Sequence, residues 1–227
     1  MGSLTVLSQP IMSTTEAARQ LRIPPRTLSQ WLEGTHRAGR WYEPILREEP
    51  TGSKDITWGE VVEARYLRAY RDERVPMQQL RPFIAALRRE FGVPYPLAHS
   101  KPFIGEGKRL LAELQNLVKL PDSLRAVYEV TTGQLMLDPR VSDFLARVDF
   151  AETGEHEALR IHPHGRKSPV VMTPDIASAA ATVRGVRTEV IAELADAGES
   201  AEDIAEDFGL PVNVVKAALS YEWENAA

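Results

Sequence analysis

The amino-terminal pattern of apolar and polar positions predicts two short helices joined by a tight turn within residues 13–32. Ser13 and Glu16 have the S-x-x-E spacing of a capping box, which marks the start of the first helix. Pro24 and Pro25 end that helix and set the backbone for the first turn of the next. The apolar residues form an inner stripe on each helix: Ala17, Ala18, Leu21, Leu28, Trp31 and Leu32. This order predicts a helix-turn-helix.

The residues after the second helix predict a β-hairpin. A short apolar-centred run, a Pro-Thr-Gly-Ser turn at 50–53 and a second short run occupy residues 35–57. Basic side chains lie along this segment: His36, Arg37, Arg40, Arg47 and Lys54. A basic hairpin that follows a helix-turn-helix is typical of a wing, whose cations neutralise DNA phosphates.

Two longer helices are predicted next. Thr57 and Glu60 repeat the capping-box spacing and open a helix through about Tyr70. Apolar residues between 77 and 91 recur at a spacing that predicts one amphipathic helix. Pro82 either kinks this helix or marks its first turn.

The middle of the chain gives a weaker pattern. Residues 108–120 fit a helix by propensity but could also be divided into strands. Residues 126–137 and 148–163 each predict a hairpin, and a short helix is expected to start at Pro139 and to continue through Val148.

Residues 168–172 predict one more strand, after which the chain is expected to be helical to its end. Ser200 and Asp203 cap the second of three helices, Gly209 ends it, and Pro211 opens the third. The inward positions are apolar: Val190, Ile191, Leu194, Ile204, Ala205, Phe208, Val214, Val215, Ala218 and Leu219. The segment from Ser200 to Leu219 therefore predicts a second helix-turn-helix.

These elements predict a mainly helical protein with small β elements, in three parts. Residues 11–95 form a winged helix-turn-helix DNA-binding domain, which ends in a proline-rich linker within residues 92–102. Residues 96–168 form a small mixed α/β connecting segment, and residues 169–227 form a helical, helix-turn-helix-like domain.

Charge separates the two predicted helix-turn-helix units. Residues 1–92 hold 14 Lys and Arg against 11 Asp and Glu, whereas residues 151–227 hold 6 against 14. Residues 189–207 contain eight carboxylates and no basic group: Glu189, Glu193, Asp196, Glu199, Glu202, Asp203, Glu206 and Asp207. Because DNA repels such a cluster, we expect the first unit to bind DNA and the second to contact protein. A solvated acidic helix face is the alternative for the second unit.

The DNA-contacting residues follow from the helix pattern. The outward side chains of the second helix are expected to face base edges: Arg26, Thr27, Ser29 and Gln30. The basic residues of the turn and hairpin are expected to contact phosphate: Arg22, Arg37, Arg40 and Lys54. The modest positive charge of this region predicts a homodimer on a two-fold operator.

Several classes of function are excluded or disfavoured. The chain has no cysteine, no run of ~18 apolar residues and no secretory signal at its start, so we expect a cytoplasmic protein without disulfides or membrane spans. The spacing of His156, His162 and His164 is more typical of an exposed loop than of a metal site. No catalytic motif occurs, so we expect no catalytic residue, no metal and no cofactor. The alternative from another class is an enzyme that uses scattered carboxylates with His162 and His164.

The first part resembles the winged helix-turn-helix of the MerR regulators over residues 11–91. The stretches "STTEAARQLRIPPRTLSQWL" and "DITWGEVVEARYLRAYRDERVPMQQL" carry the resemblance. The chain has "SQWLEG" and "DITW" where that family has a tyrosine-ending motif and an Arg-x-Tyr wing exit, so its inducer responses are not carried over.

The last part resembles the antitoxin module of VapB-type proteins. Matching positions are Pro174, Gly185, Arg187, Gly198, Glu202, Asp203, Ile204 and Ala205. The resemblance implies a VapC-type (PIN-domain) ribonuclease toxin as partner, with Mg²⁺ held by acidic residues of the toxin. It also implies a set of toxin-binding residues in this chain: Arg184, Arg187, Glu202, Asp203 and Glu206.

Together the two resemblances imply a non-catalytic antitoxin that neutralises its toxin and binds operator DNA to regulate its own synthesis. The alternative is a MerR-like regulator that responds to a small molecule and has no toxin partner.

Overall fold

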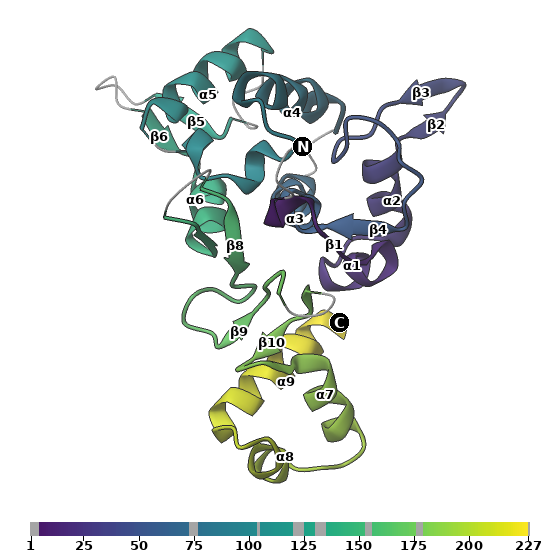
Figure 1. Ribbon diagram of the computed structural model, residues 1–227, viewed down its shortest axis with the longest axis vertical. Helices are drawn as coiled ribbons and strands as arrows, with labels where there is room; N and C mark the ends of the chain where they lie inside the picture. The colour runs from purple at the N-terminus through teal and green to yellow at the C-terminus, as the bar shows by residue number, and fades with distance from the viewer. Residues whose placement is uncertain are drawn as a thin grey trace.

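The structure of the protein, a computed structural model, describes residues 5–72, 77–103, 105–119, 125–129, 135–152, 156–175 and 179–226. It is mainly helical with small antiparallel sheets and has an N-terminal helix-turn-helix, so the predicted fold class is confirmed. Figure 1 shows a large upper body and a smaller C-terminal part below it. We call residues 10–91 the head and residues 170–226 the C-terminal module.

The head begins with the predicted helix-turn-helix. Ser13 Oγ accepts a hydrogen bond from the Glu16 amide (3.2 Å), and Pro25 stands at the first position of the second helix. All six residues of the predicted apolar stripes are buried. The elements of this region are η1 (Val6–Ser8), β1 (Pro10–Ser13), α1 (Thr14–Gln20), α2 (Pro25–Glu33), β2 (Thr35–Arg37), β3 (Arg40–Tyr42) and β4 (Asp55–Thr57).

The hairpin after α2 turns earlier than the sequence predicted. β2 and β3 pair around a turn of Ala38 and Gly39, whose φ angles are 50° and 73°. Two residues with positive φ match the twist of antiparallel strands, which explains why the chain reverses here. The predicted turn at 50–53 is therefore wrong, and β4 pairs with β1 instead.

Arg47 is buried, so its predicted place among the basic groups of the wing is wrong. Its guanidinium donates hydrogen bonds to the carboxylates of Glu33 and Glu60 and to the Asp55 carbonyl (2.8 Å). Glu33 is the last residue of α2, Asp55 is the first residue of β4, and Glu60 lies in the first turn of the following helix. Arg47 therefore ties the helix-turn-helix to the rest of the head.

The two longer helices of the head are α3 (Trp58–Asp72) and α4 (Met77–Phe91). The predicted capping box is present, since Thr57 Oγ1 accepts from the Glu60 amide (3.3 Å) and Glu60 Oε2 from the Thr57 amide (2.8 Å). Pro82 lies inside α4, beyond its first turn. The side chains of Tyr70 and Met77 lie outside the described part.

The proline-rich segment after α4 is packed onto the head, contrary to the predicted linker. Pro96, Leu97 and Ala98 are buried in the short helix η2 (Pro96–Ala98). The Leu97 amide donates to Glu63 Oε1 (3.0 Å), which also satisfies part of a buried carboxylate. The middle segment is also joined to α3 by a hydrogen bond, in which Trp58 Nε1 donates to the Ala158 carbonyl (2.7 Å).

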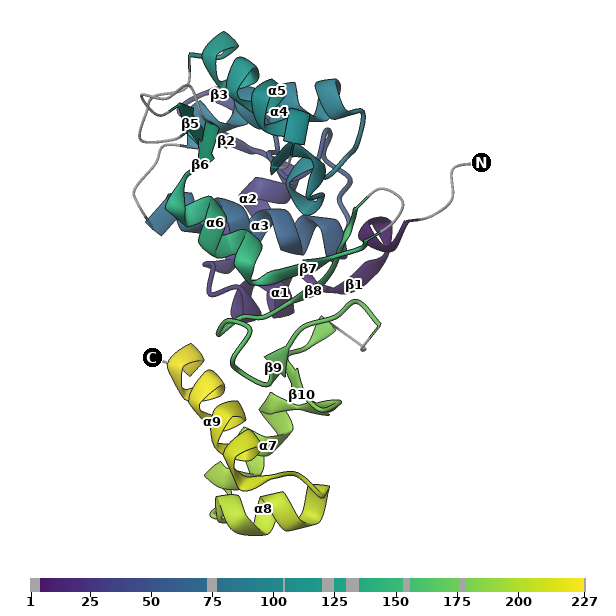
Figure 2. The ribbon, with the colours of Figure 1, turned by 90° about the vertical axis from the view of Figure 1, so that its left-hand side faces the viewer.

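The middle segment packs helices and hairpins on one side of α3 (Figure 2). The ambiguous stretch at 108–120 is helical through Leu117, and the predicted hairpins at 126–137 and 148–163 are present. The turn at 130–134 lies outside the described residues. The helix predicted through Val148 ends at Ala146, because Val148 starts the strand that pairs with Ile161. The elements are η3 (Lys101–Phe103), α5 (Gly105–Leu117), β5 (Val127–Glu129), β6 (Leu135–Leu137), α6 (Pro139–Ala146), β7 (Val148–Phe150) and β8 (Ala158–Ile161).

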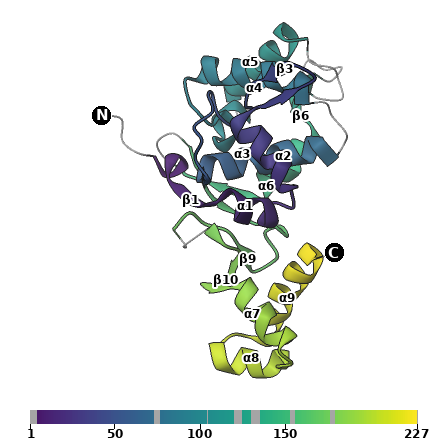
Figure 3. The same cartoon turned by 90° about the vertical axis from the view of Figure 1, so that its right-hand side faces the viewer.

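The C-terminal module combines a small sheet with three helices (Figure 3). The prediction that the chain is helical after residue 172 is wrong for residues 182–187, which form a hairpin beside β9. Arg184 and Gly185 make its turn with φ angles of 49° and 87°, a conformation that closes tight hairpins. The elements are β9 (Val170–Val171), β10 (Thr182–Val183), β11 (Val186–Arg187), α7 (Thr188–Asp196), α8 (Ala201–Phe208) and α9 (Val212–Ala226).

The predicted start and end of α8 are present, but one residue that was predicted to face inward is exposed. Ser200 Oγ accepts from the Asp203 amide (3.1 Å), and Gly209 ends α8 in the left-handed conformation (φ 61°). Phe208 was predicted to face inward but is 37% exposed. It is the last residue of α8, and no further helical turn follows to cover its ring.

Candidate nucleic-acid and partner interfaces

The outer face of α2 is polar and accessible. Arg26 and Ser29 are exposed, and Thr27 and Gln30 are half-buried. The opposite face of the helix, with Leu28 among its residues, is packed into the core. The four residues predicted to face DNA bases therefore lie on one accessible helix surface, which we call the α2 face.

The tip of the β2–β3 hairpin brings two cations together. Arg37 and Arg40 are directly opposite each other and both are exposed. Like charges across a strand pair destabilise it, so this arrangement favours an anionic partner. The Arg40 guanidinium also lies over the Tyr42 ring (5.5 Å to its centroid), and the rings of His36 and Trp41 are 4.8 Å apart.

Gly34 fixes how the hairpin leaves α2. Its φ of 74° and ψ of −174° are accessible essentially to glycine alone. A Cβ at this position would lie 2.6 Å from the Trp41 ring and 2.7 Å from the Tyr42 carbonyl. The hairpin thus leaves the helix at a defined angle, with its aromatic residues close to the backbone.

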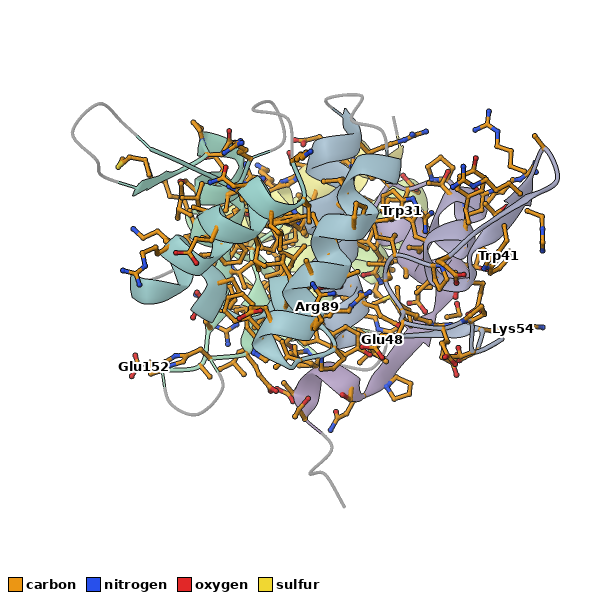
Figure 4. The ribbon with its side chains drawn as sticks, turned by 90° about the horizontal axis from the view of Figure 1, so that it is seen from above. Trp31, Trp41, Glu48, Lys54, Arg89 and Glu152 are labelled. Carbon is orange, nitrogen blue, oxygen red and sulfur yellow. The ribbon has the colours of Figure 1, made fainter. Side chains whose placement is uncertain are left out.

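The remaining two predicted phosphate contacts lie apart from the hairpin tip. Lys54 is exposed, and its carbonyl accepts from the Thr14 amide (2.7 Å), so it is held beside the start of α1. Figure 4 shows the Lys54 side chain pointing outward at the edge of the molecule. Arg22 is exposed in the turn before α2 with a φ of 51°, and the Arg68 guanidinium donates to the neighbouring Leu21 carbonyl (2.6 Å).

The charge of Arg22 also acts on groups near the junction with the C-terminal module. Burial is the main cause that lowers the pKa of Arg65, to about 10, and the charge of Arg22 contributes in the same direction. Burial likewise lowers the pKa of His164, and Arg22 again adds to the effect. Arg22 is thus close to groups at the base of the head, whereas Arg37 and Arg40 stand at the tip of the hairpin.

The exposed face of α8 is acidic. Glu202 pairs with Lys216 Nζ of α9 (3.1 Å), and this hydrogen bond is the main cause that lowers the pKa of Glu202. Asp203 accepts from the Ser200 hydroxyl (2.6 Å), and Glu206 is exposed. The structure brings these three predicted toxin-binding residues together on one helix.

The two arginines in the predicted toxin-binding set lie elsewhere in the module. Arg184 is exposed in the β10–β11 turn, and Arg187 is half-buried at the start of α7. The structure places them on the hairpin that precedes α7, not on α8.

An apolar groove on α9 is a feature that sequence reasoning missed. It has a volume of about 700 Å³ and is lined by Ala201, Lys216, Leu219, Ser220, Trp223 and Glu224. Trp223 is 56% exposed. The four-residue spacing of Leu219 and Trp223 on a helix was the available signal.

The histidines serve local contacts. His162 Nε2 is 2.9 Å from Asp149 Oδ2, while the His164 ring contacts the Tyr221 ring and lies 3.4 Å from Glu224 Oε2. His156 Nδ1 is 3.2 Å from the Ala151 carbonyl. Within the described ranges, no group of three or more His, Asp or Glu side chains could hold a metal ion. In the same ranges, no helix is both long enough and apolar enough to cross a bilayer.

Two family models match separate parts of the chain. Residues 10–84 match a model described as "Putative DNA-binding HTH domain", which covers the helix-turn-helix, the hairpin and α3. Residues 170–221 match a model described as "Protein of unknown function (DUF433)", which covers most of the C-terminal module.

Relatives from Mycobacterium tuberculosis match nearly the whole chain. One is described as "Putative antitoxin VapB45" and is 27% identical over 224 residues, covering 92% of each chain. The crystal structure of Rv2018 shares the fold with a TM-score of 0.71 at 21% identity, over 95% of this chain and 99% of that one. The uncharacterized protein Rv2308 is 33% identical over 225 residues, which cover 97% of this chain and 93% of Rv2308. The chain therefore belongs to the same family as Rv2308.

Proposed function

We propose that the protein is an antitoxin that binds operator DNA through its head and a VapC-type (PIN-domain) ribonuclease toxin through its C-terminal module. The contrast in charge between the α2 face and the α8 face carries the proposal. The similarity of residues 10–84 to a DNA-binding domain model and of the whole chain to VapB45 supports it.

In the DNA-binding role, the head is a MerR-like winged helix-turn-helix. The α2 face lies in the major groove, where Arg26 and Gln30 read base edges. The β2–β3 hairpin is the wing, and Arg37 and Arg40 at its tip contact phosphate. Lys54 and Arg22 contact phosphate at the flanks. Because these cations are few, a homodimer on a two-fold operator provides the affinity.

In the toxin-binding role, the C-terminal module supplies charge and apolar surface together. A ribonuclease needs a basic surface for RNA, and the acidic α8 face complements such a surface. The apolar groove beside Trp223 adds buried area next to that face. Arg184 and Arg187 pair with carboxylates of the toxin's metal site. In this proposal, residues 11–95 bind DNA, residues 96–168 connect the two parts, and residues 169–227 bind the toxin.

The DNA role is tested with a double variant of the α2 face. Arg26→Ala with Gln30→Ala is expected to remove sequence-specific binding to the DNA upstream of the protein's own reading frame, measured by a mobility-shift titration. Sequence-specific binding that survives in the double variant would show that α2 is not the reading helix.

The toxin role is tested by co-expression with the product of the adjacent reading frame. We expect that product to be toxic alone, to be neutralised by this protein and to co-purify with it. Arg187→Glu should weaken neutralisation and leave DNA binding intact. Equal neutralisation by this variant would count against the role of Arg187, and a non-toxic neighbour that forms no complex would count against the antitoxin role.

A further inference from the structure

A cavity lies between the hairpin and α4 and includes Arg40 of the hairpin tip in its lining. It has a volume of about 730 Å³. Trp41 and Pro44 line it from β3 and the segment that follows, and Pro82 and Ala85 line it from α4. Small organic ligands occupy pockets of roughly 300–1,000 Å³ with mainly apolar walls. The cavity therefore has the size and the lining of a small-molecule site.

Arg81 is part of the cavity lining and has a guanidinium that is not fully hydrogen-bonded. Its Nε and Nη1 atoms are buried and have no hydrogen-bond partner in the described part of the chain. Burial lowers the pKa of Arg81, with only Glu43 acting in the opposite direction. Buried charged donors without partners are costly, so an acceptor at this position would stabilise the protein.

The other buried arginines of the lining are already engaged. Arg47 donates to Glu33 and Glu60, and Arg88 Nη2 donates to Glu63 (3.1 Å) and to the Ile45 carbonyl (2.8 Å). These hydrogen bonds are made to partners inside the head. Arg47 and Arg88 therefore stabilise the wall of the cavity, and Arg81 is the candidate for binding a ligand.

The remaining charges of the lining favour a single negative charge. Arg40, Arg81 and Arg89 line the cavity together with two carboxylates, Glu43 and Glu48, which leaves one positive charge in excess. Figure 4 labels Arg89 on α4, Glu48 on the segment after β3, and Trp41 on the hairpin. A dianion such as a phosphate monoester would be repelled by the two glutamates, whereas a single carboxylate would neutralise the one excess positive charge.

We infer that this cavity binds a small organic monoanion with an aromatic or apolar body. The anionic group accepts hydrogen bonds from Arg81, and the body lies between Trp41 and the α4 residues Pro82 and Ala85. Because Trp41 belongs to the hairpin, the bound molecule contacts the hairpin and α4 at once. This site is independent of whether the protein has a toxin partner.

Calorimetric titration of the full chain with 2-naphthoate, and with its neutral analogue 2-naphthamide, tests the inference. We expect 2-naphthoate to bind more tightly than the amide, because only the carboxylate can pair with Arg81. Arg81→Gln should weaken 2-naphthoate by at least about tenfold, the loss of one charged hydrogen bond. Arg109→Gln, a change at an exposed arginine of α5, is the matched control and should bind like the unaltered chain.

Two further measurements separate loss of the site from loss of the fold. Without ligand, Arg81→Gln should keep or raise the thermal midpoint, because it removes buried donors that lack partners. Ala85→Leu fills the cavity from α4 and should abolish 2-naphthoate binding while Arg81 remains. The inference is overturned if 2-naphthoate does not bind the unaltered chain, if the amide binds equally well, or if binding survives in both variants.

Discussion

The chain contains two helix-turn-helix units that begin in the same way. They differ in the burial of their ion pairs and in the surfaces that they expose. Ser13 caps α1 and Ser200 caps α8 through the same contact to the amide three residues later. A buried ion pair then fixes the first unit within the head, whereas the ion pair of the second unit, between Glu202 and Lys216, is exposed. Local signals thus start both units, and the tertiary surroundings decide which surface each one offers.

The largest expected effect is on the buried ion pairs of the head. Arg47→Met leaves two carboxylates, Glu33 and Glu60, without their cation and should lower the free energy of unfolding by about 3–5 kcal/mol. Chemical denaturation measures this loss. Arg40→Met, which removes an exposed arginine of the hairpin, is the control and should change stability by less than about 0.5 kcal/mol. Similar values for both variants would show that Arg47 does not hold the head together.

The dependence of stability on pH should have opposite signs at Glu63 of the head and at Glu189 of the C-terminal module. Burial raises the pKa of Glu63 to about 7, although Arg88 and the Leu97 amide act to lower it. The folded head then keeps a proton that the unfolded chain loses above its ordinary pKa of 4.5. The free energy of unfolding should therefore fall as pH rises from about 4.5 to about 7, and Glu63→Gln should flatten this slope.

Glu189 at the start of α7 provides the contrast. Its hydrogen bond from Arg19 lowers its pKa, so its contribution is present above pH 4.5 and is lost as pH falls through the lowered value. Glu189→Gln should remove part of the acid sensitivity and leave the slope between pH 4.5 and 7 unchanged. An unchanged slope in Glu63→Gln would contradict the assignment to Glu63.

A smaller and equal effect is expected at the two helix caps. Ser13→Ala and Ser200→Ala each remove one side-chain acceptor and should each cost about 1 kcal/mol. Thermal unfolding of the two variants checks the equality. A cost confined to one of them would mean that the two units do not share the same local start.

The smallest effect is expected at the exposed pair of the C-terminal module. Lys216 and Glu202 have side chains that are 61% and 63% exposed, so Lys216→Gln should leave stability without measurable change. A clear loss in thermal midpoint would show that α8 is held by this pair and would weaken the contrast with the head.

The sequence predicted the features that depend on neighbouring residues. The caps at Ser13 and Ser200, the apolar stripe with Leu28 and the stop at Gly209 all follow from local spacing, and the structure contains them. The polar face of α2 could be predicted for the same reason, because the inward residues of a helix fix its outward ones.

The features that depend on distant partners could not be predicted in this way. In the sequence, Arg47 looks like one more basic residue of the hairpin. Only the structure shows that it pairs with Glu33 and Glu60. The hairpin at 182–187 is short, and its strands form because β9 lies alongside. The cavity at Arg81 arises from the packing of two segments that are far apart in sequence, so no local pattern indicates it.

The salt dependence of DNA binding tests most directly whether the head, and not the C-terminal module, contacts DNA. Binding of the full chain to the DNA upstream of its own reading frame would be measured over a range of salt concentrations for Arg37→Gln and Lys216→Gln, which remove one positive charge from each helix-turn-helix region. We expect Arg37→Gln to weaken binding and to reduce the salt slope by about 2, because each protomer of the dimer loses one phosphate contact, and Lys216→Gln to change neither. A reduced slope in Lys216→Gln with an unchanged slope in Arg37→Gln would contradict the division of roles.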